Sequence, residues 1–263
     1  KAGELEQKRI NLFEELSLEA KSVVAEEYPS RKILFDKNSE NILPLASLTK
    51  LMTAVVLQDA YSYAKTPFPL SVRISENAIH QEGDSGLLSG EKFYFDDLID
   101  VMLVNSSNDA AYALAAFAGN LFLGGATDEQ GATNSFIAAM NRKKDDLELF
   151  SMNFFNPTGL DIGTGHTGGY GSAKDISSLS AYLIENYPFL LEKTQYELFS
   201  AVSDVKSHTF KNSNIDAFRV PGLLLSKTGF SDLAGGNLTI AADIGLGRIV
   251  LITVLGSTFD GRF

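Results

Sequence analysis

Short apolar runs mark both ends of the chain as strand-forming. Ser22–Glu26 and Lys32–Asp36 are separated by Tyr28-Pro29-Ser30, which has the composition of a turn. In the last third, the runs LLLSKTG, NLTIAADI and RIVLITVLG are rich in Leu, Ile, Val and Thr and are separated by glycine-containing turns. These three runs predict antiparallel strands that follow one another in a meander.

Helical spacing of apolar residues dominates the middle of the chain. One apolar stripe predicts a helix over about residues 47–61. Residues 92–119 predict two helices, divided by the polar residues 105–109, with Gly119 ending the second. Another helical pattern begins near Asp175.

Strands at both ends and helices between them predict one antiparallel sheet, built from both ends of the chain and flanked by helices. The expected fold class is α+β. We expect a sheet lobe of about residues 21–45 and 205–263, a helical lobe of about residues 46–204, and an active site between them. The charged residues 1–20 predict a lead-in or linker, with a packed helix as the alternative.

The composition is that of an ordinary globular protein, with 44% hydrophobic and 21% charged residues among 263. A formal charge of −11 argues against a nucleic-acid partner and a basic membrane-binding patch, because both need clustered Lys and Arg. Without cysteines there are neither disulfides nor thiolate metal ligands. No transmembrane run is visible in this chain, and we expect any membrane anchor to lie in a segment that is not present here.

The first candidate for chemistry is Ser47-Leu48-Thr49-Lys50, an S-x-x-K pattern at the expected start of a helix. Residues three apart lie on one helix face, so Lys50 can reach the Ser47 hydroxyl. The helix N-terminus would stabilise an oxyanion there, and a lysine with a lowered pKa can accept the serine proton. The alternative is a helix-capping serine beside an exposed lysine.

The second candidate is Ser106-Ser107-Asn108, an S-x-N pattern between two apolar helices. Ser106 could relay a proton between Lys50 and a leaving group, and the Asn108 amide could bind a substrate carbonyl. The alternative is a simple helix cap, for which Ser and Asn are favoured.

The third candidate is Lys227-Thr228-Gly229, at the end of an apolar strand. Gly229 would let a ligand approach the backbone closely, and Lys227 and Thr228 can bind a carboxylate. An extended substrate could add to the edge of this strand through main-chain hydrogen bonds. The alternative is a lysine that protects an edge strand from aggregation.

Together the three motifs follow the order found in β-lactamases and penicillin-binding proteins, each in the required structural context. Seven stretches, three of which contain the motifs, carry the likeness: ILPLASLTKLMTA, ISENAI, SSNDAAYALA, FFNPTGLD, YGSAKDISSL, KTGFSDLAGGNL and VLGSTFDGRF. From about residue 20 to 263, the chain resembles the low-molecular-mass penicillin-binding proteins that are D-alanyl-D-alanine carboxypeptidases, peptidase family S11.

This resemblance implies the transpeptidase-like fold of β-lactamases and penicillin-binding proteins. It also implies a serine enzyme that removes the terminal D-alanine from peptidoglycan stem peptides through an acyl group on Ser47. Lys50 would be the base, and Ser106 and Asn108 would form the second catalytic element.

Substrate binding is implied for the third motif and the residues after it. Lys227, Thr228 and Ser231 would hold the terminal carboxylate beside Gly229. The backbone N–H groups of Ser47 and Phe230 would form the oxyanion hole.

The implied partners are the peptidoglycan stem peptide as substrate and β-lactam antibiotics as covalent inhibitors of the serine. No metal and no cofactor are expected, and His80, His166 and His208 lack metal-ligand spacing. The expected location is outside the cytoplasmic membrane, in the periplasm or at the cell surface.

Some positions depart from the family pattern. Many members carry an Arg before the third motif, where this chain has Asn212-Ser213-Asn214, and Arg219 is the nearby candidate to replace it. Phe230 is more apolar than expected, and the segment 141–150 is atypical, which bears on substrate selectivity.

Three other functions remain as alternatives. A D,D-endopeptidase that cleaves peptidoglycan crosslinks would use the same site. A class A β-lactamase would need a Glu in an E-x-x-L-N setting, and no Glu between Ser106 and Lys227 has one. A catalytically silent penicillin-binding sensor would lack a central motif residue, whereas all of them are present.

Overall fold

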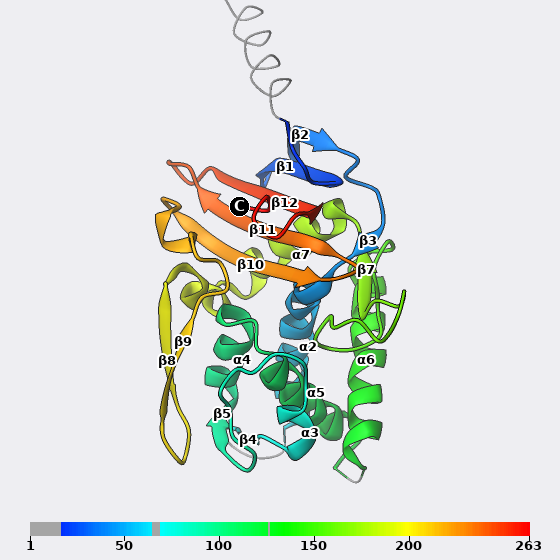
Figure 1. Ribbon diagram of the computed structural model, residues 1–263, viewed down its shortest axis with the longest axis vertical. Coiled ribbons are helices and arrows are strands. Elements are labelled where there is room, and N and C mark those ends of the chain that lie inside the picture. Colours follow the sequence, from blue (N-terminus) through cyan, green and yellow to red (C-terminus); the bar gives the residue numbers. More distant parts are fainter. Residues whose placement is uncertain (1–16, 65–68, 126) are drawn as a thin grey trace, which may run out of the picture.

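A five-stranded antiparallel sheet forms one end of the computed structural model, which describes residues 17–64, 69–125 and 127–263 (Figure 1). In spatial order its strands are β10 (Leu223–Ser231), β11 (Gly235–Asp243), β12 (Ile249–Ser257), β1 (Ser22–Tyr28) and β2 (Lys32–Lys37). Strand β1 pairs with β12, with Ser22 opposite Leu255. The prediction of one sheet built from both ends of the chain is confirmed.

Helices form the other end of the molecule and cover one face of the sheet (Figure 1). The α-helices are α2 (Thr49–Tyr63), α3 (Glu76–Ile79), α4 (Phe95–Val104), α5 (Asn108–Phe122), α6 (Glu129–Asp146) and α7 (Ala173–Asn186). Single 3-10 turns are η1 (Ala46–Leu48), η2 (Pro188–Leu190), η3 (Glu192–Gln195) and η4 (Ala217–Arg219). Helix α7 packs against the sheet, and α2 contacts α4, α5, α6 and α7. Helix α2, which contains Lys50 of the first motif, therefore lies at the centre of the helical half.

Small sheets complete the described part of the chain. They consist of β3 (Leu43–Pro44) with β7 (Gly169–Gly171) and β6 (Asn153–Phe154), β4 (Ser71–Arg73) with β5 (Lys92–Tyr94), and β8 (Leu198–Val202) with β9 (Ser207–Lys211). The β8–β9 hairpin runs beside α4 rather than joining the large sheet (Figure 1). This hairpin spans the boundary expected at residue 205, and the division into two lobes remains a prediction. The lead-in predicted over 1–20 falls mainly on residues 1–16, which lie outside the described residues.

Two helix boundaries differ from the prediction: residues 92–94 form strand β5 instead of the start of a helix, and α5 ends later than expected. Helix α5 does not stop at Gly119 but continues to Phe122. A Cβ atom on Gly119 would lie 1.9 Å from the carbonyl oxygen of Ala132 on α6. The glycine therefore permits the close packing of two helices and does not act as a helix terminator.

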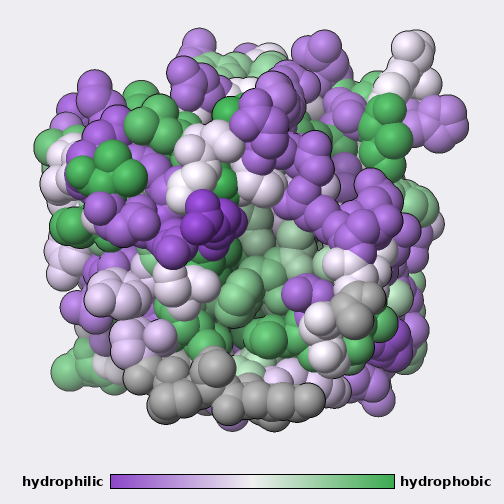
Figure 2. Space-filling view, turned by 90° about the horizontal axis from the view of Figure 1, so that it is seen from below, coloured by the Kyte–Doolittle hydropathy of each residue, from purple (hydrophilic) through white to green (hydrophobic). Residues whose placement is uncertain are grey.

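The apolar stripe of α2 is fully buried, as its spacing predicts. Leu51, Met52, Val55 and Val56 are each at most 1% exposed and belong to the main hydrophobic core. Figure 2, which views the helical end, shows apolar side chains gathered in the middle of this face and hydrophilic ones around them. Within the described residues, no helix is both long and apolar enough to cross a bilayer.

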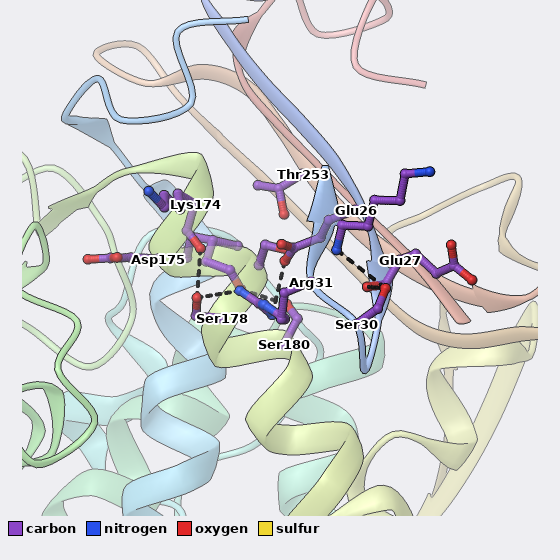
Figure 3. Close-up of polar contacts among 12 residues, drawn as sticks. Glu26, Glu27, Ser30, Arg31, Lys174, Asp175, Ser178, Ser180 and Thr253 are labelled. Atoms are coloured by element: carbon purple, nitrogen blue, oxygen red, sulfur yellow. Dashed lines mark hydrogen bonds and ion pairs between the residues drawn. The ribbon is translucent and has the colours of Figure 1, made fainter. Parts of the chain in front are cut away.

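A buried carboxylate connects the β1–β2 turn to α7. Glu26 is 2% exposed, accepts a hydrogen bond from Ser177 and forms an ion pair with Arg31 at 3.0 Å. Arg31 also donates to Ser178 Oγ on α7 at 2.7 Å (Figure 3). A buried charge is tolerated only when it is paired, so Arg31 stabilises the packing of this turn on α7.

Replacing Arg31 by Ala is expected to lower the free energy of unfolding by about 2–3 kcal/mol, because Glu26 would remain buried without its cation. The matched control is Arg248→Ala, which removes an exposed partner of Glu27 at 3.2 Å. We expect that control to cost at most about 0.5 kcal/mol. Urea unfolding of both variants measures the difference, and equal losses would show that the Glu26 pair contributes no more than a surface pair.

Candidate active site

The S-x-x-K serine lies in the 3-10 turn that leads into α2. Ser47 is the middle residue of η1, and Lys50 is the second residue of α2. Lys50 Nζ lies 2.8 Å from Ser47 Oγ. The hydrogen bond expected from the spacing of the motif is thus present.

Lys50 has three oxygen neighbours at hydrogen-bonding distance. Besides Ser47, its Nζ atom donates to Asn108 Oδ1 and to the carbonyl oxygen of Thr158, both at 2.7 Å. An amide oxygen and a backbone carbonyl can only accept, whereas the serine hydroxyl can also donate. A neutral Lys50 therefore uses its two N–H groups on Asn108 and Thr158 and keeps its lone pair for the Ser47 hydroxyl.

The environment of Lys50 favours its neutral form. Complete burial lowers the pKa of this lysine to about 7. The negative charge of the Asp109 carboxylate acts in the opposite direction and raises the pKa, but by less than burial lowers it. The fraction of free amine therefore rises as the pH increases through about 7. A base with this pKa is well matched to proton abstraction near neutral pH.

A second buried lysine meets the S-x-N motif. Lys227 Nζ donates to Ser106 Oγ at 2.7 Å and to the Thr228 carbonyl at 2.9 Å. Burial, followed by the positive charges of Lys50 and Arg262, holds the pKa of Lys227 well below its usual value. The amine of Lys227, which lies on β10, is therefore placed to exchange a proton with the Ser106 hydroxyl.

Strand β10 passes very close to the start of η1. A Cβ atom on Gly229 would lie 3.0 Å from the Leu45 carbonyl oxygen and 3.2 Å from the Ser47 nitrogen. From β11, Asn237 donates to the carbonyl oxygens of Pro44 and Leu45, both at 3.0 Å. The third motif and the turn that carries Ser47 therefore lie in contact. Strand β10 is the outermost strand of its sheet, and on its outer edge the Ser226 N–H donates to Thr194 Oγ1 at 3.2 Å.

Two non-glycine residues beside the motifs have left-handed backbone conformations. Ala46, which precedes Ser47, has φ +45°, and Ser106 has φ +65°. Such conformations cost free energy and are concentrated at functional sites. Their occurrence next to two of the three motifs fits a site whose geometry is imposed by the surrounding fold.

The remaining residues predicted for substrate binding lie on or after β10. Thr228 donates to Ser213 Oγ at 2.7 Å. Phe230 is 49% exposed, with its ring centroid 5.2 Å from that of Phe259. The Ser231 hydroxyl accepts from a backbone N–H three residues later at 3.2 Å, so part of its hydrogen-bonding capacity is used in the turn.

Arg219 is directed to the surface. Its side chain is 70% exposed, forms an ion pair with Asp216 at 2.8 Å and lies over the Phe218 ring. None of these contacts involves a motif residue, which gives no support for Arg219 as a carboxylate ligand.

The histidines are separate from the three motifs. His80 and His166 are exposed, and His208 is buried against Glu91 at 3.1 Å. Among the residues that the structure describes, no group of three or more His, Asp or Glu side chains is arranged to hold a metal ion.

Four groups at the site were missed by sequence reasoning. They are the Thr158 carbonyl, the Asp109 carboxylate, the Ser213 hydroxyl and the Arg262 guanidinium, which donates to the Gly229 carbonyl at 2.9 Å. Asp109 directly follows the second motif, and its position there was an available signal. A backbone carbonyl such as that of Thr158 has no signature in the sequence.

Two proteins of known name are similar to this chain in sequence over most of its length. D-alanyl-D-alanine carboxypeptidase DacF of Bacillus subtilis is 31% identical over 245 residues, which cover 93% of this chain and 59% of that protein. A D-alanyl-D-alanine endopeptidase of Pseudomonas aeruginosa is 28% identical over 237 residues, covering 85% of this chain and 67% of its own. The chain thus spans little more than half the length of its carboxypeptidase relative.

The structural neighbours are penicillin-binding proteins. Penicillin-Binding Protein D2 from Listeria monocytogenes, solved in an ampicillin-bound form, has a TM-score of 0.74 and 27% identity, with 94% of both chains covered. D-alanyl-D-alanine carboxypeptidase DacD from Francisella tularensis has a TM-score of 0.80 at 24% identity, covering 94% of this chain and 68% of its own. The α+β transpeptidase-like fold expected from the sequence is confirmed.

A family match covers nearly the whole chain. Residues 9–258 match the peptidase S11 family, described as D-alanyl-D-alanine carboxypeptidase. This range contains all three motifs and the residues that meet at Lys50. The chain belongs to the D-alanyl-D-alanine carboxypeptidase family, peptidase S11.

Proposed function

We propose that this protein is a serine-type D-alanyl-D-alanine carboxypeptidase that removes the terminal D-alanine from peptidoglycan stem peptides. The observation that carries the proposal is the arrangement at Lys50, whose Nζ lies 2.8 Å from Ser47 Oγ. The same nitrogen donates to two oxygens that can only accept, Asn108 Oδ1 and the Thr158 carbonyl, both at 2.7 Å. Such a lysine is an oriented base for a serine nucleophile.

The reaction would proceed by acyl transfer in two steps. Lys50 takes the proton of Ser47 Oγ as this oxygen attacks the carbonyl between the two D-alanines. The peptide C–N bond then breaks, and Lys50 gives this proton to the departing amine of D-alanine by way of the Ser106 hydroxyl, which Lys227 contacts at 2.7 Å. Water next attacks the ester while Lys50 takes a proton from it, and Lys50 returns that proton to Ser47 Oγ as the ester C–O bond breaks and the shortened stem peptide leaves.

Substrate would bind along the outer edge of β10. Main-chain hydrogen bonds to this strand would align an extended peptide, and Gly229 would let it lie close to the strand backbone. Lys227, Thr228 and Ser231 would hold the terminal carboxylate, while the Asn108 amide would donate to a substrate carbonyl. The N–H groups of Ser47 and Phe230 would stabilise the oxyanion.

A D,D-endopeptidase is the second candidate. The Pseudomonas aeruginosa relative, at 28% identity, is an endopeptidase, and the same catalytic group serves both reactions. The two activities differ in what lies beyond the scissile bond, namely a free D-alanine carboxylate or a crosslinked stem. We favour the carboxypeptidase because residues 9–258 match the family of that description.

Three further properties belong to the same proposal. The substrate, the peptidoglycan stem peptide, implies a location outside the cytoplasmic membrane. β-Lactams, which resemble the D-Ala-D-Ala terminus, would acylate Ser47 and block it. The sheet lobe and the helical lobe would form the two sides of the site, with motifs from both.

The test follows the protein by intact-mass spectrometry during incubation with benzylpenicillin, in parallel with D-alanine release from a D-Ala-D-Ala-ended peptide. We expect a long-lived adduct together with D-alanine release. An adduct combined with cleavage of crosslinked peptide dimers alone would establish the endopeptidase. Destruction of penicillin without a lasting adduct would indicate a β-lactamase, and neither adduct nor release would indicate a silent sensor.

A further inference from the structure

The turn that supplies the third acceptor of Lys50 is organised by one side chain. Asn156 Oδ1 accepts from the backbone N–H groups of Thr158 at 3.2 Å and Gly159 at 2.7 Å, and from the Thr158 hydroxyl at 3.0 Å. Asn156 Nδ2 donates to the Leu160 carbonyl at 2.8 Å. The peptide units on both sides of the Thr158 carbonyl are therefore fixed by Asn156.

Helix α2 holds the same turn from the other side. Thr53 is fully buried and follows Lys50 by three residues, so both side chains lie on one helix face. Its hydroxyl donates to the Pro157 carbonyl at 2.7 Å, whereas the Thr49 carbonyl within the helix is 3.5 Å away. The shorter bond is the effective one, and it secures the turn directly beside Lys50.

We propose that Thr53 and Asn156 are positioning residues for Lys50, which hold the Thr158 carbonyl at Nζ and thereby direct the lysine lone pair to the Ser47 hydroxyl. This inference rests on the proposed function, in which Lys50 is the base. Neither residue contacts the reacting atoms. Ser47, Lys50 and Thr53 recur every three residues, so η1 and the start of α2 together carry nucleophile, base and support for the base on one side.

Loosening the turn changes Lys50 in a specific way. Without a well-placed Thr158 carbonyl, one N–H group of the neutral amine would donate to Ser47 Oγ instead. The nitrogen lone pair would then point away from the Ser47 hydroxyl. The ammonium form would also lose an acceptor, and a charged donor loses more than a neutral one. The pKa of Lys50 would then fall below its value of about 7.

The test is the pH dependence of the second-order rate of acylation by benzylpenicillin. For Thr53→Val, which keeps the shape and removes the hydroxyl, we expect a rate lower by roughly tenfold at the optimum. The acid limb of its pH profile should move down by about half a pH unit, because the ammonium is destabilised. Asn156→Ala should act in the same direction, so the test does not depend on the folding of a single variant.

Two controls separate positioning from loss of stability. Thr53→Ser keeps the hydroxyl and should restore the wild-type acid limb. Asn141 makes the same kind of paired hydrogen bonds, but with the backbone of Phe154 at 2.8 and 3.0 Å, outside the turn. Asn141→Ala should lower stability without moving the acid limb.

Each outcome has a distinct meaning. If the wild-type protein forms no adduct, the proposed function fails, whatever the variants do. If the wild type is acylated and Thr53→Val and Asn156→Ala share its acid limb, the positioning role is wrong. A shifted limb in these two variants, restored by Thr53→Ser, supports the inference.

Discussion

Ser47→Ala is expected to abolish both the benzylpenicillin adduct and the release of D-alanine. The substitution removes the hydroxyl that lies 2.8 Å from Lys50 Nζ, and in the proposed mechanism no acyl-enzyme can form without it. We expect the rate of D-alanine release to fall by at least about 10³-fold, as for other serine nucleophiles. Intact-mass spectrometry and a D-alanine assay measure the two losses on the same sample.

A serine with a purely structural role provides the control. Ser172 caps α7, and its hydroxyl accepts from the Asp175 N–H at 3.1 Å. Ser172→Ala should lower the free energy of unfolding by about 1 kcal/mol and leave the adduct intact. Retention of normal D-alanine release by Ser47→Ala would exclude Ser47 as the nucleophile.

Gly159→Ala should impair the site from a position with no functional side chain. Gly159 has φ +83°, and a Cβ atom there would lie 1.9 Å from the Ala46 carbonyl oxygen. This steric clash would move the turn that contains Gly159 away from η1, and the Thr158 carbonyl and Ser47 would both be displaced. We expect acylation to slow by about 10²-fold and the free energy of unfolding to fall by about 3 kcal/mol or more.

A glycine in the same loop separates the clash from the backbone conformation. Gly165 has φ +78°, and a Cβ atom there would meet nothing within 4 Å. Gly165→Ala should therefore cost only about 1 kcal/mol of stability and leave the acylation rate unchanged. Equal effects of the two substitutions would show that the contact with Ala46 is unimportant.

Sequence reasoning located the three motifs in their elements because each has a local signature. The S-x-x-K spacing places Ser47 and Lys50 on one helix face, and an apolar strand precedes Lys227. The meander of the last three strands also followed from local patterns, since turns and alternating apolar runs are short-range features. That the strands at the start of the chain join the same sheet was predicted from the order of elements, with strands at both ends of the chain and helices between them.

What sequence reasoning missed depends on contacts between distant segments. Gly119 resembles a helix terminator until α6 is seen to pack against it, 1.9 Å from where its Cβ would lie. The contact between Lys50 and the Thr158 carbonyl joins residues 108 positions apart through a backbone atom. Arg262 reaches Gly229 from the end of the described chain, and its stretch VLGSTFDGRF resembles the family without indicating a contact with the third motif.

The pairing of β1 with β12 has a consequence for folding during synthesis of the chain. Ser22 lies opposite Leu255, so β1 cannot complete its pairing with β12 until the ribosome has passed residue 255. Contacts so distant in sequence form late and slowly. Ser47 and Lys50 are synthesised well before β10, the strand that completes their surroundings. A nascent chain that ends before β10 would therefore carry the proposed nucleophile and base without the strand that is proposed to bind substrate.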